Sequence, residues 1–133
     1  MNIKYPLTII IVFIFYSCQR NNIHEIKANL MSNDKDKIIE ACEKINSKNK
    51  EYIPYLLYHL NDPRIVHSAT DYGKSIYQIK IQKLIEIIGA NPIAKNINYY
   101  PDSNIIKDYI TWAKYNGFGS VLDSLNAISI NKL

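Results

Sequence analysis

The sequence predicts an all-α fold, either a compact bundle of about five to six helices or a short α–α superhelix. Apolar residues recur at spacings of three and four along most of the 133-residue chain, as they do in helices with one buried face. The strict alternation of apolar and polar residues that is typical of strands is not sustained anywhere. Residues that begin or end helices, such as Asp102 and Gly89, stand at the borders of the apolar runs.

The first two predicted helices cover residues 22–32 and 35–46. Either Asn33 or Asp34 can cap the second helix, because a short polar side chain can accept a hydrogen bond from the first free backbone N–H groups. Their predicted buried faces consist of Ile23, Ile26, Leu30, Ile38, Cys42 and Ile45.

A third helix is predicted around Pro54, because proline fits the first turn of a helix, where its missing N–H costs little. We expect it to end at Asp62, because the residue before a proline, here Pro63, is pushed out of the helical region. Residues 63–73 then read as an irregular polar connection. The core candidates of this helix are Leu56, Leu57 and Leu60.

The clearest helical pattern covers residues 74–89, and Gly89 is a natural end for it. After a loop that contains two prolines, Asp102 or Ser103 caps a helix that Gly117 ends. A short last helix is expected up to about Ile128. The predicted inward residues of these helices are Ile76, Ile81, Leu84, Ile85, Ile88, Ile105, Tyr109, Ile110, Ala113, Val121 and Leu125.

Two stretches of the chain are similar to each other at a distance of 46 residues, "KIIEAC" at 37–42 and "KLIEII" at 83–88. This distance lies within the period of about 40–47 residues of HEAT-type helical repeats. Residues 35–65 resemble one HEAT-like unit, with two helices followed by Asp62 and Arg64. The resemblance implies that this aspartate and arginine tie neighbouring units together. A short superhelix and a compact bundle both remain open at this point.

The amino-terminal residues 1–17 have the pattern of an export signal. The apolar run of residues 7–16 is ten residues long and follows Lys4. A helix needs about 20 apolar residues to cross a bilayer, so a span is not expected here. The run does have the length of the apolar region of a secretory signal.

The motif "FYSC", Phe15 to Cys18, resembles the lipobox of bacterial lipoproteins. The resemblance implies cleavage before Cys18, lipidation of its thiol, and anchoring in the bacterial cell envelope. Gln19 after the cysteine implies the outer membrane, on its periplasmic or surface face. The predicted organisation is a signal peptide at 1–17, an anchor segment with a first helix at 18–33, and a HEAT-like helical domain at 34–133.

The charges of the chain do not predict a nucleic-acid partner. The formal net charge is +4, and residues 34–51 contain five lysines and five acidic residues, which cancel. A nucleic-acid-binding surface usually gathers basic residues on one face, and no such cluster is present in the sequence.

The sequence predicts neither a catalytic centre nor a bound metal. The three histidines, His24, His59 and His67, do not pair at the spacing of a helical zinc site. Cys42 falls on an apolar helix face, which predicts a buried, inert thiol rather than a nucleophile. We therefore expect no enzymatic activity and no cofactor.

Two features suggest a binding surface. Tyrosines recur every three residues at 52, 55 and 58, and tyrosine can grip a peptide or a sugar because it is large, stiff and half polar. The segment 62–77 gathers polar and aromatic side chains within a connection, where binding residues are common. The alternatives are helix packing for the tyrosines and a solvated connection for the segment. The candidate binding residues are Tyr55, Asp62, Arg64, His67, Tyr72, Lys74 and Tyr77.

Taken together, the sequence predicts a lipid-anchored envelope protein whose helical surface binds a protein or peptide without catalysis. An immunity-type protein that binds a cognate toxin is one alternative. A protein that acts on envelope glycans, as an enzyme or as its accessory subunit, is another.

Overall fold

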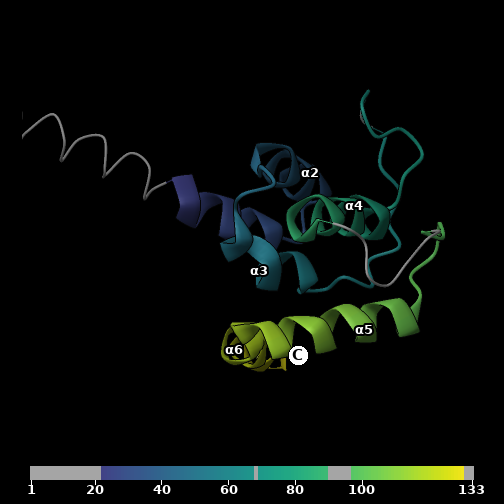
Figure 1. The fold of residues 1–133 in the computed structure, drawn as a ribbon. Helices are drawn as coiled ribbons and strands as arrows, with labels where there is room; N and C mark the ends of the chain where they lie inside the picture. Colours follow the sequence, from purple (N-terminus) through teal and green to yellow (C-terminus); the bar gives the residue numbers. More distant parts are fainter. Residues whose placement is uncertain (1–21, 68, 90–96, 131–133) are drawn as a thin grey trace, which may run out of the picture.

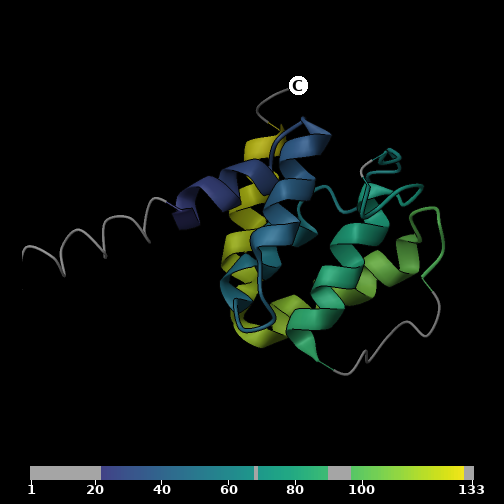
Figure 2. The same cartoon turned by 90° about the horizontal axis from the view of Figure 1, so that it is seen from above.

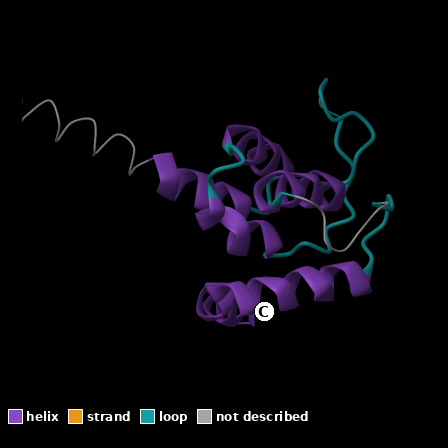
Figure 3. Ribbon diagram, viewed as in Figure 1, coloured by secondary structure: helices purple, strands orange, loops and turns teal. Residues whose placement is uncertain are grey.

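The computed structural model describes residues 22–67, 69–89 and 97–130 of the chain. These residues form an all-α bundle, as predicted, and they contain no β-strand (Figures 1 and 3). Residues 22–30 are helical. They are followed by α2 (Lys35–Lys44), α3 (Ile53–Leu57), α4 (Ile76–Ile88), α5 (Ser103–Ala113) and α6 (Gly119–Ile130). The predicted signal peptide and Cys18 lie outside the described residues.

The predicted helix caps are confirmed at three positions. Asp34 caps α2 by accepting a hydrogen bond from the N–H of Asp36 at 3.0 Å. Asp102 caps α5 by accepting from Asn104 and Ile105 at 2.8 and 3.3 Å. Gly89 ends α4 with φ +93°, a conformation that glycine adopts without a steric penalty. These ends follow from local chemistry, which is why the sequence alone predicts them.

The predicted end of the third helix is wrong. α3 does not reach Asp62, because Tyr58 already has extended backbone, with ψ 125°, and His59 has φ +48°. The carbonyl oxygen of Tyr58 instead accepts a hydrogen bond from the ammonium of Lys80, at 2.7 Å. A distant side chain on α4 therefore satisfies a carbonyl at the end of α3, so the helix ends earlier than its own sequence indicates.

The backbone of His59 offers a first test of this helix end. In the left-handed region, alanine costs about 1 kcal/mol more than glycine, whereas inside a helix alanine is the more stable residue. We expect the His59→Gly variant to be more stable than His59→Ala by about 1 kcal/mol, as measured by urea unfolding. Both variants lose the same imidazole, so an alanine variant at least as stable as the glycine variant would contradict this conformation.

The helices pack around α3. α2 lies against α4, and α3 contacts α4, α5 and α6, so that α5 and α6 cover the other side of the bundle (Figures 1 and 2). The chain turns between α5 and α6 through Lys114–Phe118, where Gly117 has φ +89°. The predicted break at Gly117 is therefore confirmed, and α6 follows it directly.

The core is formed mainly by the apolar faces that the sequence predicts. Cys42 is buried as expected, at 2% exposure. The prediction for α4 missed four residues, because this helix is covered on more than one side: Tyr77, Ile79, Lys80 and Ile87 are also buried. The buried core residues of the predicted faces include Ile26, Leu30, Ile38, Ile45, Leu56, Leu57, Leu60, Ile76, Ile81, Leu84, Tyr109, Ala113 and Leu125. Leu122 on α6 is also buried and was not predicted.

The hydroxyl of Tyr77 lies in this core and has no hydrogen-bond partner among the residues that the structure describes. The residue is fully buried, and burial raises the pKa of Tyr77. The backbone of Asp102 approaches the hydroxyl and opposes part of that rise, but it does not reach the geometry of a hydrogen bond. A buried hydroxyl without a hydrogen bond destabilises the folded chain, because it loses its hydrogen bonds with water on folding and gains none within the protein.

We therefore expect the Tyr77→Phe variant to be more stable than the wild type by about 1 kcal/mol in urea unfolding. The matched control is Tyr109→Phe. Tyr109 is also buried, at 1% exposure, but its hydroxyl is not among the buried polar atoms of the described residues that lack a hydrogen-bond partner. That variant should gain no stability. Equal effects of the two substitutions would show that the Tyr77 hydroxyl is satisfied in solution.

Candidate functional site

The connection between α3 and α4 is a hydrogen-bonded hairpin, which we call the hairpin loop (residues 62–67 and 69–75). The N–H of Val66 donates to the carbonyl of Lys74 at 2.9 Å, and the N–H of Gly73 donates back to Val66 at 3.0 Å. An antiparallel β-bridge pairs Ile65 with Ser75. The described residues of this connection contain no helix or strand, in line with the expected irregular connection, but several backbone hydrogen bonds order them, and the loop projects away from the helices (Figure 1).

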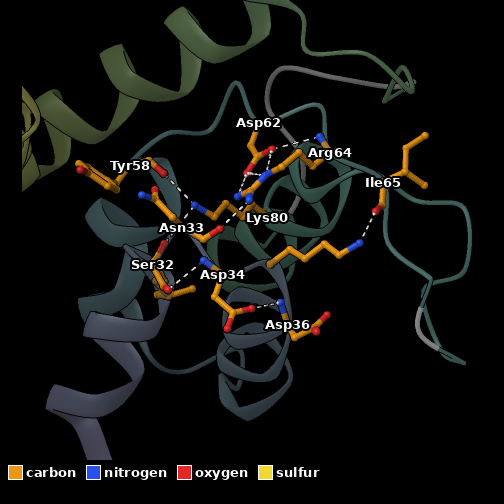
Figure 4. A network of polar contacts seen from close by, with 11 residues as sticks. Ser32, Asn33, Asp34, Asp36, Tyr58, Asp62, Arg64, Ile65 and Lys80 are labelled. Atoms are coloured by element: carbon orange, nitrogen blue, oxygen red, sulfur yellow. Dashed lines mark hydrogen bonds and ion pairs between the residues drawn. The ribbon is translucent and has the colours of Figure 1, made fainter. Parts of the chain in front are cut away.

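Asp62 and Arg64 hold the base of the hairpin loop. The Arg64 guanidinium binds the Asp62 carboxylate through Nε and Nη2, at 2.6–3.1 Å. Its Nη1 donates to the carbonyl of Asn33 at 2.6 Å (Figure 4). Burial raises the pKa of Asp62, but its hydrogen bonds with Arg64 outweigh this and hold the pKa below its ordinary value. The pair joins the loop to the turn before α2, which is a structural role.

The upper part of the loop carries two exposed aromatic rings. His67 and Tyr72 lie with their ring centroids 5.7 Å apart, and Tyr72 is 77% exposed. These are the two candidate binding residues that the structure places together on an open surface.

Two further tyrosines, which the sequence reasoning missed, lie on the same end of the bundle. The rings of Tyr99 and Tyr100 are 5.1 Å apart, and Tyr100 is 70% exposed. Ser75 Oγ donates to the carbonyl of Tyr99 at 3.0 Å and so joins this segment to the hairpin loop. The base of the hairpin loop lies near this segment, whereas the far end of the loop stands apart from it in Figure 1. Figure 2 shows both segments on the same side of the bundle. The available signal was two adjacent tyrosines in a loop before Pro101. We call these two aromatic pairs, His67 with Tyr72 and Tyr99 with Tyr100, the aromatic end.

Lys74 lies in a groove between the hairpin loop, α2 and α4. Its ammonium forms an ion pair with Asp71 at 2.6 Å and contacts Gln82 at 3.4 Å. The groove has a volume of about 120 Å³, and Cys42 and Lys83 also line it. Burial raises the pKa of Cys42 to about 11, so the thiol stays protonated at neutral pH and is a poor nucleophile.

The remaining two candidate residues do not belong to the aromatic end. Tyr77 is fully buried, so its assignment to a binding surface is wrong; it follows a polar loop in sequence but packs into the core. Tyr55 is half-buried on α3, and the ammonium of Lys27 lies 5.0 Å from its ring centroid. In the tyrosine series, Tyr52 is buried and Tyr58 packs against His59, with ring centroids 4.3 Å apart. The packing alternative therefore describes these tyrosines better than a binding stripe.

Lys80 is the polar residue that the sequence reasoning missed entirely. Its side chain is 1% exposed, and its ammonium donates to the carbonyls of Tyr58 at 2.7 Å and Leu30 at 3.3 Å (Figure 4). Burial lowers the pKa of Lys80 from 10.5 to about 8. The signal in the sequence was its place on the apolar face of α4, four residues after Ile76 and four before Leu84.

Lys80 meets the ends of two helices at once. Leu30 is the last residue of the helix over 22–30, and Tyr58 follows α3. The carbonyl oxygens at a helix end have no partner within the helix, and the helix dipole makes that end negative. The ammonium satisfies both ends, which explains how a lysine can be buried without a carboxylate bound to it.

The described part of the chain contains neither a cluster of potential metal ligands nor a membrane-spanning helix. Across residues 22–67, 69–89 and 97–130, no three His, Cys, Asp or Glu residues lie together as a potential metal site. Over the same residues, no helix is both long enough and apolar enough to cross a bilayer.

Comparison with known proteins does not assign the chain to a family. No protein-family model matches it, and neither the curated proteins nor the solved structures contain a significant match.

Proposed function

We propose that this chain is a lipid-anchored protein of the bacterial envelope that binds a protein or peptide partner through its aromatic end and has no catalytic role. The observation that carries the proposal is the display of four aromatic rings by two short segments that are joined at Ser75 and Tyr99. Tyrosine is enriched in protein interfaces because it offers a large contact area with few rotatable bonds.

The fixed backbone of the hairpin loop supports this role. Its cross-strand hydrogen bonds and the Asp62–Arg64 pair order the loop before any partner arrives. A preordered surface loses less conformational entropy on binding, so more of the contact energy is available as affinity.

The position of the aromatic end relative to the proposed anchor also supports the proposed binding role. Cys18 is separated in sequence by only three residues from residue 22, the first helical residue that the structure describes. The described part of this helix starts on the opposite side of the bundle from the hairpin loop (Figure 2). An anchored chain can therefore turn its aromatic end away from the membrane, toward a partner in the aqueous compartment.

A HEAT-like arrangement would divide these helices into two successive pairs, although the main contacts of α2 and α3 are with α4 and not with each other. In that reading α2 and α3 form one pair and α4 and α5 the next, and the contacts of α2 with α4 and of α3 with α5 are those between equivalent helices. Asp62 and Arg64 join the hairpin loop to the turn before α2, which belongs to the same proposed unit, whereas the resemblance implies a tie between neighbouring units. Helical repeats present fixed faces of this kind to proteins and peptides.

The test is a crosslinked pull-down of the full-length lipoprotein from cell envelopes, read by mass spectrometry. We expect a single partner from the wild type and a roughly tenfold lower recovery with the double variant Tyr72→Ser/Tyr100→Ser, because exposed tyrosines are frequent hot spots of interfaces. The matched control is Tyr115→Ser. Tyr115 is 87% exposed but lies in the turn after α5, away from the aromatic end.

The outcomes separate the competing functions. Loss of the partner in the Tyr115→Ser control, or its retention in the double variant, would contradict the aromatic end as the binding surface. Loss with a Cys18→Ala variant would additionally support the anchor. Recovery of a toxin would identify an immunity protein, whereas recovery of envelope glycan without protein would replace the proposal by the glycan alternative.

A further inference from the structure

A small cavity lies beside the ammonium of Lys80. Its volume is about 30 Å³, and its lining includes Asn33, Tyr58, His59, Asp62 and Arg64 together with Lys80. The buried lysine and the Asp62–Arg64 ion pair at the base of the hairpin loop, which Figure 4 shows near each other, therefore both line this cavity.

The ammonium of Lys80 has one donor to spare. A lysine ammonium carries three N–H groups, and the described protein supplies two acceptors, the carbonyls of Leu30 and Tyr58. The side chain is 1% exposed, so bulk water does not supply the third acceptor freely. A buried charge whose hydrogen bonds are incomplete is costly, which favours any small acceptor that fits the space next to it.

The size of the cavity and the charges around it indicate which small molecule it can hold. A site needs about 10–15 Å³ to hold one water molecule, so a volume of about 30 Å³ is sufficient for one or two. An anion would face the Asp62 carboxylate and two carbonyl oxygens, and a cation would face Lys80 and Arg64. Water is suited to both kinds of neighbour, because it accepts from the ammonium and donates to the carboxylate.

We propose that this cavity is a binding site for one or two ordered water molecules, one of which accepts a hydrogen bond from Lys80 and donates one to Asp62. Such a water would complete the hydrogen bonding of the ammonium. It would also connect the ends of two helices to the residue that begins the hairpin loop, and so couple the position of the loop to the packing of α4.

The test counts long-lived water molecules by magnetic relaxation dispersion of water oxygen-17, using the full chain. We expect the wild type to show one or two more such molecules than the Lys80→Met variant. The matched control is Lys83→Met, which removes a lysine from the same helix outside the cavity and should leave the number unchanged. Equal numbers in the wild type and a folded Lys80→Met variant would overturn the proposal.

A crystal structure of the wild type keeps the proposal testable if Lys80→Met does not fold. We expect electron density for a water within about 3.2 Å of Lys80 Nζ, a usual hydrogen-bond distance, and within reach of the Asp62 carboxylate. A dry cavity, or a side chain that fills it, would refute the site.

Discussion

Replacing Lys80 with alanine is expected to lower the free energy of unfolding at pH 7 by about 3 kcal/mol, among the larger effects of a single substitution. Three terms decide this value. Losing the buried stem costs about 0.8 kcal/mol per methylene. Leaving two carbonyls without a partner costs about 1–3 kcal/mol each. Against these losses, the substitution relieves the cost of burying a charge.

The free energy gained by no longer burying a charge is smaller than the free energy lost with the stem and the two carbonyl hydrogen bonds. The pKa of Lys80 falls from 10.5 to about 8, and each pKa unit corresponds to about 1.4 kcal/mol. The penalty for keeping the ammonium charged is therefore roughly 3 kcal/mol at neutral pH. It offsets the loss of the stem, and the unsatisfied carbonyls of Leu30 and Tyr58 remain as the net cost.

The Lys80→Met variant separates these terms, because methionine keeps most of the apolar stem and removes only the ammonium. We expect it to lose about 1 kcal/mol, clearly less than the alanine variant. The control Lys107→Ala, at an exposed position on α5, should stay within about 0.5 kcal/mol of the wild type. Urea unfolding followed by circular dichroism measures all three. A methionine variant as stable as the wild type would show that the two carbonyls find water once the lysine is gone.

The same residue shows what the sequence could predict and what it could not. Asp34, Asp102 and Gly89 act on backbone groups within a few residues, so their roles follow from the local sequence. The end of α3 depends instead on Lys80, which lies 22 residues further along the chain than Tyr58. No local pattern contains that contact, so the predicted helix was too long.

The candidate site, too, could be predicted from the sequence only where it depends on neighbouring residues. The hairpin loop could be singled out from its composition, and His67 and Tyr72, which the sequence selects as candidate binding residues, are exposed on it. Tyr77 was placed on the surface because it follows polar residues, although it is a core residue of α4. Tyr100 was missed because its position depends on the contact between Ser75 and Tyr99, which lie 24 residues apart. Surface patches built from distant segments are the part that sequence patterns do not contain.

The stability of the folded chain is expected to rise between pH 8 and pH 9, which is unusual, and Lys80 is the cause. Its pKa is about 8 in the folded chain and 10.5 when exposed. Between these values the unfolded chain binds more protons, so the free energy of unfolding increases with pH by about 1.4 kcal/mol per unit. The penalty is fully present below pH 8 and is relieved as the ammonium loses its proton.

Cys42 acts in the opposite direction at higher pH. Burial raises its pKa from 9.0 to about 11, so above pH 9 the unfolded chain loses the thiol proton first. The free energy of unfolding then falls by about 1.4 kcal/mol per unit from this cause. Between pH 9 and about 10 the two residues nearly cancel, and above pH 10 the buried tyrosines with raised pKa values, Tyr52, Tyr77 and Tyr109, lower the stability further.

Urea unfolding at half-unit steps from pH 7.5 to 10 distinguishes the two groups. The wild type should gain about 1 kcal/mol between pH 8 and 9 and then level off. A Cys42→Ala variant loses the opposing group, so its stability should keep rising to pH 10, by about 2–3 kcal/mol in all. The stability of the Lys80→Met variant should be constant up to about pH 9 and fall beyond it, because the Cys42 thiol and the buried tyrosines, whose pKa values are also raised, remain. A wild type whose stability is constant or falls between pH 8 and 9 would mean that Lys80 is not held as a buried ammonium, and the helix ends at Leu30 and Tyr58 would then need another partner.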